Sequence, residues 1–89
     1  MPGIHVSGVL VHAHPKHLEN VRMQLESTPG VEIETVTSAG RLVTVVERPT
    51  SYELADVFTH IQNTAGVLSA SLVYHYSNDE DAVDQEIKS

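Results

Sequence analysis

The sequence repeats itself at a spacing of 36 residues, and this repeat limits the folds that the chain can adopt. Apolar residues at helical spacing occur in both copies, and glycine–valine pairs follow them at Gly30-Val31 and Gly66-Val67. Such self-similarity is typical of two copies of one supersecondary unit. The helical residues that correspond are Leu18, Val21 and Leu25 in the first copy and Leu54, Val57 and Ile61 in the second.

Each copy has the pattern of a strand, a helix and a second strand. Pro15 suits the first position of a helix, and Pro29-Gly30 ends that helix. Thr50 with Glu53 forms a capping-box pattern, which predicts the start of the second helix. The stretches that are rich in Val, Ile and Leu, or that alternate apolar with acidic residues, predict strands over residues 4–13, 31–36, 42–46 and 67–76.

The resulting order, β-α-β-β-α-β, predicts an α+β fold of the ferredoxin-like class. In that fold a four-stranded antiparallel sheet has the strand order 4-1-3-2, and both helices cover one face. We expect a single domain over residues 1–76. Residues 77–89 are polar and acidic with isolated apolar residues, and we expect them to form a frayed tail.

Composition excludes several classes of function. The 89 residues include no cysteine, so thiolate metal sites, disulfides and thiol redox chemistry are excluded. A net charge of −7, one Phe and no Trp make nucleic acid a poor partner and favour a basic one. No phosphate loop or nucleophile motif is present, so we expect neither an enzyme nor a cofactor. The N-terminus lacks a secretory pattern and no stretch is apolar enough to span a bilayer, so we expect a cytoplasmic protein.

Three histidines cluster between the first strand and the first helix, at His12, His14 and His17. Their spacing would allow two imidazoles to approach one ion. The only acid nearby is Glu19, and histidines in loops are more often solvated than bound to metal. We therefore expect no functional metal, although a histidine metal carrier stays open as an alternative.

The central strands raise a question, because they are apolar at nearly every position. A sheet covered on one face should alternate apolar with polar residues. We assign even-numbered residues to the core: Val6, Leu10, Leu42, Val46, Ala70, Leu72 and Tyr74. The uncovered face would then be an apolar strip, although a bulge would reverse the assignment within a strand. That strip holds Val9, Val11, Val43, Val45, Ser69, Ser71, Val73 and His75, with Glu32, Glu34 and Glu47 at its margin.

Several stretches resemble the NapD family. The most specific is Ser71-Leu72-Val73-Tyr74-His75 followed by an acidic tail, within a last strand that begins at Gly66. Residues 29–33, 40–47 and 7–11 are also similar, and the resemblance covers about residues 5–76. The histidine-rich stretch 12–17 departs from the family pattern, and the family offers no role for it.

The resemblance implies a function that composition does not reveal. NapD proteins are cytoplasmic chaperones of NapA, the catalytic subunit of periplasmic nitrate reductase. They bind its twin-arginine signal peptide at the sheet face and delay export until the cofactors are installed. By this resemblance we expect the uncovered strip to be a peptide-binding site. The strip could instead be a dimer interface or be covered by the tail, and we expect a monomer or weak homodimer. The alternative is a ligand-binding regulatory domain of the same fold that dimerises through its sheet.

Overall fold

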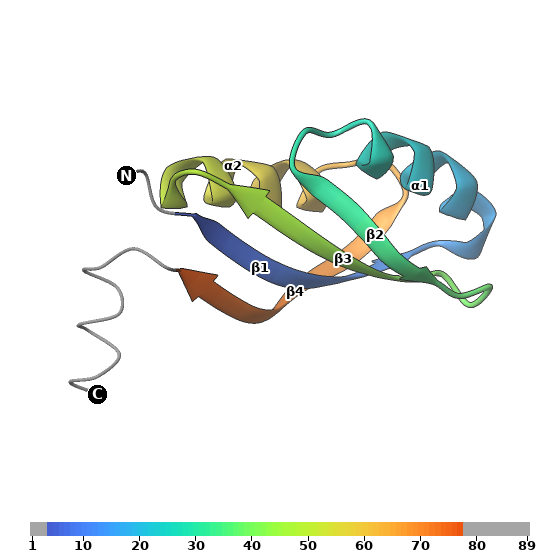
Figure 1. Cartoon of the computed structure of the whole chain (residues 1–89). Helices are drawn as coiled ribbons and strands as arrows, with labels where there is room; N and C mark the ends of the chain where they lie inside the picture. The colour runs from blue at the N-terminus through green and yellow to red at the C-terminus, as the bar shows by residue number, and fades with distance from the viewer. Residues whose placement is uncertain (1–3, 78–89) are drawn as a thin grey trace.

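Four strands and two helices follow one another in the order that the repeat predicts (Figure 1). The structure is a computed structural model and describes residues 4–77. A short 3-10 helix, η1, precedes the first α-helix. The elements are β1 (His5–Ala13), η1 (Pro15–His17), α1 (Leu18–Glu26), β2 (Val31–Val36), β3 (Arg41–Arg48), α2 (Ser51–Gln62) and β4 (Val67–Ser77).

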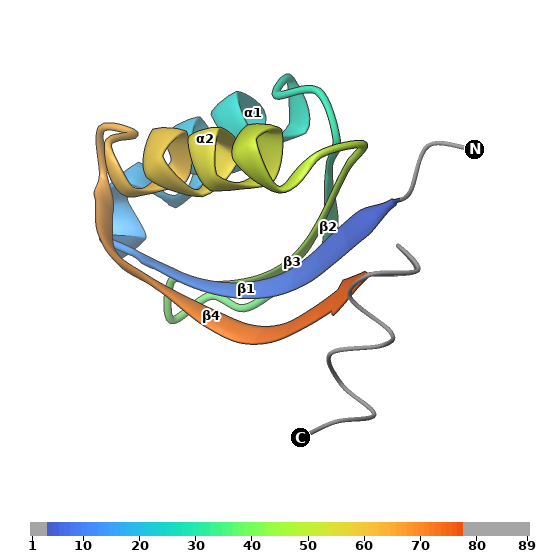
Figure 2. The same ribbon diagram turned by 90° about the vertical axis from the view of Figure 1, so that its left-hand side faces the viewer.

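The strands form one antiparallel sheet in the order β2-β3-β1-β4, which confirms the predicted topology. Both helices lie on one side of the sheet, and the sheet curves toward them (Figure 2). Neither helix covers the opposite side. We call that opposite side the open face.

The two copies of the repeat end their helices in the same way. Thr28 donates its backbone N–H to Leu25, and Thr64 donates to Ile61. Gly30 and Gly66 then take φ values of 86° and 96°, a left-handed conformation that favours glycine. Each turn leads directly into a strand, so the repeated sequence produces a repeated turn.

The second helix begins at the predicted N-cap residue, Thr50, and the predicted reciprocal bond to the Glu53 carboxylate comes from the Thr50 hydroxyl in place of its backbone N–H. The Thr50 side chain accepts a hydrogen bond from the Glu53 backbone N–H at 3.1 Å. The Thr50 hydroxyl also donates to the Glu53 carboxylate at 3.0 Å, and Arg48 donates to the same carboxylate at 2.7 Å. These hydrogen bonds, from Thr50 first and Arg48 second, hold the pKa of Glu53 below its ordinary value.

The core lies between the helices and the concave side of the sheet. Thr44 on β3 is a polar residue that is fully buried in this core. The Thr44 hydroxyl donates a hydrogen bond to the Val9 carbonyl at 2.9 Å. That bond offsets the cost of burying the hydroxyl. The buried apolar residues are Val9, Val11, Ala13, Val21, Leu25, Leu42, Val46, Leu54 and Ile61.

The face assignment is correct for β3 and wrong for β1. Leu42 and Val46 are buried as predicted, but on β1 the odd-numbered Val9 and Val11 are buried, while Leu10 is exposed. The cause is the register, because every β1–β3 pair joins an odd-numbered residue with an even-numbered one, as in Val9 with Thr44. Directly opposed residues share a face, so the two strands cannot have the same parity. Val6 likewise lies on the open face.

The last strand changes parity along its length. Ala70 and Leu72 lie on the helix side, opposite Val11 and Val9, as predicted. A register shift follows, because Gly8 pairs with Tyr74, so Val73 is an extra residue in a bulge. Beyond this bulge, Tyr74 lies on the open face and His75 on the helix side. The predicted positions of these two residues were therefore wrong.

The predicted boundary between the domain and the tail is shifted by one residue. Ser77, which we expected to begin the tail, is the last residue of β4 and is buried. The rest of the predicted tail, residues 78–89, lies outside the described residues.

Candidate functional site

The open face is built from side chains that the strand register aligns in rows across the sheet. β1 and β3 supply the middle of the sheet, β4 supplies one end of every row, and β2 supplies the other end of the two central rows. From the C-terminal end of β3 to its start, the rows are Glu47 with Val6 and Tyr76; Glu32 with Val45, Gly8 and Tyr74; Thr35 with Val43, Leu10 and Ser71; and Arg41 with His12 and Ser69.

The middle of the open face is apolar and accessible. Leu10 is 36% exposed and Val43 is 43% exposed, and these two residues are paired across β1 and β3. Tyr74 and Tyr76 extend the same surface on β4 and are about half exposed. A contiguous apolar surface of this kind on the described part of a small domain marks an interaction site. We call Leu10, Val43, Val45, Tyr74 and Tyr76 the apolar strip.

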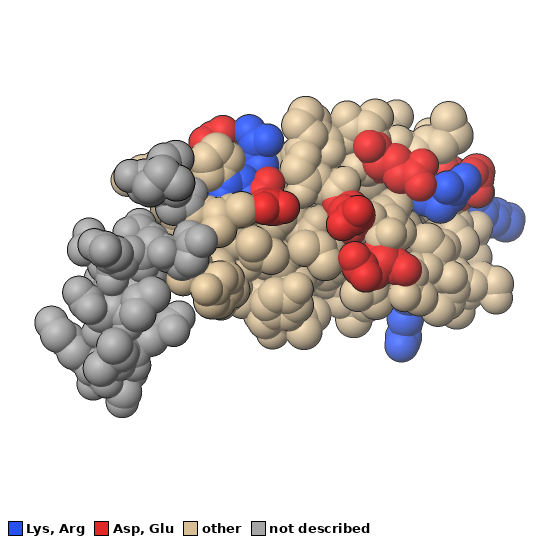
Figure 3. Space-filling view, in the orientation of Figure 1, with Lys and Arg blue, Asp and Glu red and all other residues tan. Residues whose placement is uncertain are grey.

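One end of the apolar strip is acidic. Glu47 stands in the row of Tyr76, and Glu32 stands in the row of Tyr74. Both carboxylates are exposed, and Glu34 follows on the same edge strand at a register shift. In the space-filling view, acidic groups gather over β2 along this flank (Figure 3). The acids thus border the strip at the end near Glu47 and along the adjoining β2 edge, where a cation that lies on the strip would reach them.

The other end of the open face is basic. Arg41 begins β3 and is paired with His12, and His12 is paired in turn with Ser69 on β4. Arg41 is exposed, and its guanidinium is always charged at physiological pH. The face therefore has a charge gradient along β3, from Arg41 at one end to Glu47 at the other.

The structure brings together about half of the residues that the sequence pointed to. Val9 and Val11 are excluded, because they are 1% and 0% exposed in the core. His75 lies on the helix side of the sheet, and Val73 and Glu34 occupy irregular positions in the register. The part of the remaining residues in binding stays a prediction. Those that lie on the open face are Glu32, Val43, Val45, Glu47, Ser69 and Ser71.

The sequence reading missed the residues that give the face its largest apolar area. The sequence pattern predicts that Leu10 and Tyr74 lie in the core and assigns no face to Tyr76, whereas all three are exposed. One signal could have found the tyrosines: a buried Tyr must place its hydroxyl on a partner or in water, so a Tyr-rich last strand favours an exposed position. The bulge at Val73 has no comparable signal in the sequence.

The three clustered histidines do not converge on one point. His12 is on the open face, whereas the Nδ1 atom of His14 accepts the Lys16 backbone N–H at 3.2 Å and caps η1. His14 and His17 meet edge to face, with ring centroids 5.6 Å apart. Within residues 4–77 no three potential metal ligands gather in one place.

Helix length bears on membrane insertion. Within the described residues, neither α1 nor α2 is long and apolar enough to cross a bilayer.

The element order and the single helix layer define an α+β domain of the ferredoxin-like class, with one face of its sheet left uncovered. The model of the NapD protein family matches residues 4–79. The chain therefore belongs to the NapD family, as the resemblance of its motifs predicted.

Named relatives and a solved structure agree with this assignment. "Chaperone NapD" of Escherichia coli K12 is 32% identical over 76 residues, which are 84% of this chain and 87% of that protein. "Chaperone NapD" of Haemophilus influenzae is 29% identical over 77 residues, or 85% of this chain and 83% of that one. The solution structure of "the E. coli Tat proofreading chaperone protein NapD" matches with a TM-score of 0.77 and 31% identity, and covers 86% of this chain and 82% of that one. The chain is a chaperone of the NapD type.

Proposed function

We propose that this chaperone binds the twin-arginine signal peptide of the catalytic subunit of periplasmic nitrate reductase, NapA, on its open face. Binding would delay export in the cytoplasm until the cofactors of that subunit are installed. The observation that carries the proposal is the apolar strip with carboxylates at one end. It matches a ligand in which two arginines precede an apolar segment.

The apolar strip would bind the apolar segment of the peptide. A helical peptide lying across the sheet would bury its apolar side against Leu10, Val43 and Tyr74. These side chains are already accessible, so the peptide could bind them without a rearrangement of the sheet. Burial of apolar area contributes roughly 25 cal/mol per Å² before the cost of ordering the peptide is subtracted. The strip therefore supplies affinity for an apolar segment, with little selection among sequences.

The carboxylates at the acidic end would bind the two arginines of the peptide. Guanidinium groups bind carboxylates through paired, charge-assisted hydrogen bonds. Glu47 and Glu32 stand in neighbouring rows next to the strip, so both would face a peptide that lies along it. Arg41 at the opposite end repels a second cation. The charge gradient favours one direction, with the arginine pair near Glu47 and the apolar segment running toward Arg41.

A calorimetric titration with synthetic signal peptides tests the proposal. We expect saturable one-to-one binding of the native peptide, weaker binding when both arginines are replaced by lysine, and much weaker binding when both are replaced by glutamine. The lysine peptide keeps the charge and loses the bidentate geometry, so it separates the two contributions. Equal affinity for all three peptides, or no binding of any, would contradict the proposed recognition.

A paramagnetic label at the N-terminal end of the same peptide tests its direction. Broadening of the backbone signals of Glu47 and Arg48, with Arg41 and Leu42 unaffected, is the expected result. The reverse pattern would mean that the charge gradient does not orient the peptide.

A further inference from the structure

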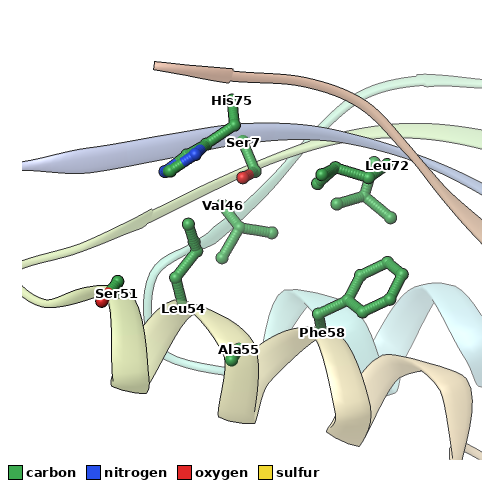
Figure 4. Close-up of a pocket in the computed structure, with 9 residues that line it drawn as sticks. Ser7, Val46, Ser51, Leu54, Ala55, Phe58, Leu72 and His75 are labelled. Carbon is green, nitrogen blue, oxygen red and sulfur yellow. The ribbon is translucent and has the colours of Figure 1, made fainter. Parts of the chain in front are cut away.

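A second apolar site lies on the other side of the sheet, between α2 and the strands β1, β3 and β4 (Figure 4). It is a cavity of about 230 Å³ that opens between α2 and β4. Leu72 and Ala55 stand at the opening and are exposed, although Leu72 is on the helix side of the sheet. The lining residues are Ser7, Val9, Val46, Ser51, Leu54, Ala55, Phe58, Leu72 and His75.

The cavity has a polar end and an apolar end. Figure 4 shows Ser7, Ser51 and His75 toward one side, with Phe58 and Leu72 toward the other. The imidazole of His75, at the polar end, stacks on His5, with ring centroids 5.7 Å apart and planes inclined by 16°.

Ser7 is the observation that points to a ligand. Its side-chain oxygen is buried and makes no hydrogen bond to the described residues, and the residue as a whole is 2% exposed. The hydroxyl projects from β1 into the cavity (Figure 4). A buried hydroxyl without a partner is destabilising, so a group that donates to it or accepts from it would bind with a gain.

We propose that this cavity binds a phenol-like group, that is, one aromatic ring with a hydroxyl at its tip. The hydroxyl would meet Ser7 at the polar end, and the ring would lie between Phe58 and Leu72. The size is sufficient, because an apolar cavity of about 150 Å³ accepts benzene, and this one has a volume of about 230 Å³. Phe58 and His75 provide aromatic walls, against which a ring packs edge to face or offset.

The same chemistry has two sources, a free phenol and the side chain of a tyrosine in a bound polypeptide. The edge position of β4 leaves the opening accessible to both within the described structure. The site is separate from the open face, since Leu72 and Leu10 point to opposite sides of the sheet. We therefore expect that the cavity can be occupied without the signal peptide.

Methyl NMR with p-cresol and toluene tests the proposal. We expect p-cresol to produce saturable shifts of the Leu54, Leu72 and Val46 methyl signals while the Leu10 and Val43 methyls on the open face stay in place. Toluene should bind at least threefold more weakly. In Ser7→Ala, p-cresol and toluene should bind equally. Absence of saturable shifts at the cavity, or a p-cresol preference that survives Ser7→Ala, would overturn the proposal.

A filling variant provides the matched control. Ala55→Leu, at the mouth of the cavity, should weaken p-cresol at least fivefold, whereas Ala65→Leu, exposed and outside the cavity, should leave it unchanged. Equal effects of the two variants would overturn the assignment. N-acetyl-tyrosinamide then separates the sources: binding comparable to p-cresol supports a tyrosine of a polypeptide, and binding of p-cresol alone supports a free phenol.

Discussion

The ring of Tyr74 lies over Gly8, its direct partner across the antiparallel β1–β4 pair. A Cβ atom at position 8 would stand 2.6 Å from Cδ2 and 3.0 Å from Cζ of that ring. The space above Gly8 on the central strand β1 is thus filled by an aromatic side chain from the edge strand β4. This is a known way of stabilising glycine in a sheet. The arrangement also flattens Tyr74 onto the open face, where it becomes part of the apolar strip.

Gly8→Ala should therefore displace the Tyr74 ring and weaken signal-peptide binding. The stability should change by no more than about 1 kcal/mol, because alanine loses less backbone entropy than glycine on folding and the ring is free to swing outward. Calorimetry on Gly8→Ala, Tyr74→Ala and the double variant measures the coupling. In Tyr74→Ala the further change at position 8 should have little effect; fully additive losses would show that the two residues act separately.

Val45 and Val46 are neighbours on β3 and lie on opposite faces of the sheet. Introducing a charged side chain should therefore affect peptide binding at one position and folding at the other. Val45→Asp, on the open face, should fold and lose affinity for the peptide because the charge would be desolvated on binding. Val46 is 1% exposed, so Val46→Asp should destabilise the fold by more than about 3 kcal/mol. Denaturant unfolding and peptide titration together check both expectations. An unfolded Val45→Asp would place that residue in the core and contradict the face assignment.

Glu47 should be the most important carboxylate for the arginine pair, because it lies on the central strand β3, one residue before its end, in the row of Tyr76. Glu47→Gln should weaken the native peptide about tenfold, or about 1.4 kcal/mol. Glu34→Gln is the matched control, since Glu34 sits at a register shift on the edge strand, and its loss should be small and removed by salt. Similar, salt-sensitive losses for both variants would indicate long-range attraction in place of a direct contact.

Glu53 links stability to pH. Hydrogen bonds from Thr50 and Arg48 lower its pKa in the folded state, so the carboxylate stabilises the fold at pH values above its unfolded pKa. That contribution is lost as the pH falls through the folded pKa. Glu53→Gln should therefore lower Tm at neutral pH. In acid, the Tm values of the variant and of the parent protein should converge.

The fold could be predicted from the sequence because its signals are local. The helical spacing of Leu54 and Ile61, the Thr50 cap and the repeated glycine turns each depend on a few neighbouring residues. The repeat also implied the topology, because two β-α-β copies have few ways to share one sheet. The family resemblance then pointed to the function, which no local pattern revealed.

The faces of the strands could not be predicted in the same way. β1 is apolar at both parities, with Val9 and Val11 on one and Leu10 on the other, so hydrophobicity does not choose between them. The repeat offset of 36 is even and suggested equal parity for β1 and β3, yet their register pairs odd with even. Both the register and the bulge at Val73 arise from packing between distant segments, and the sequence of one strand does not contain them.

A residue-resolved NMR titration with the twin-arginine signal peptide tests the central claim most directly. The account predicts that the methyl signals of Leu10, Val43 and Val45 and the ring signals of Tyr74 and Tyr76 shift and saturate together. The methyls of Val57 and Leu18, on the helix layer, should not move. Saturable shifts confined to the helix layer or the α2 cavity, with the apolar strip unchanged, would contradict the open face as the binding site.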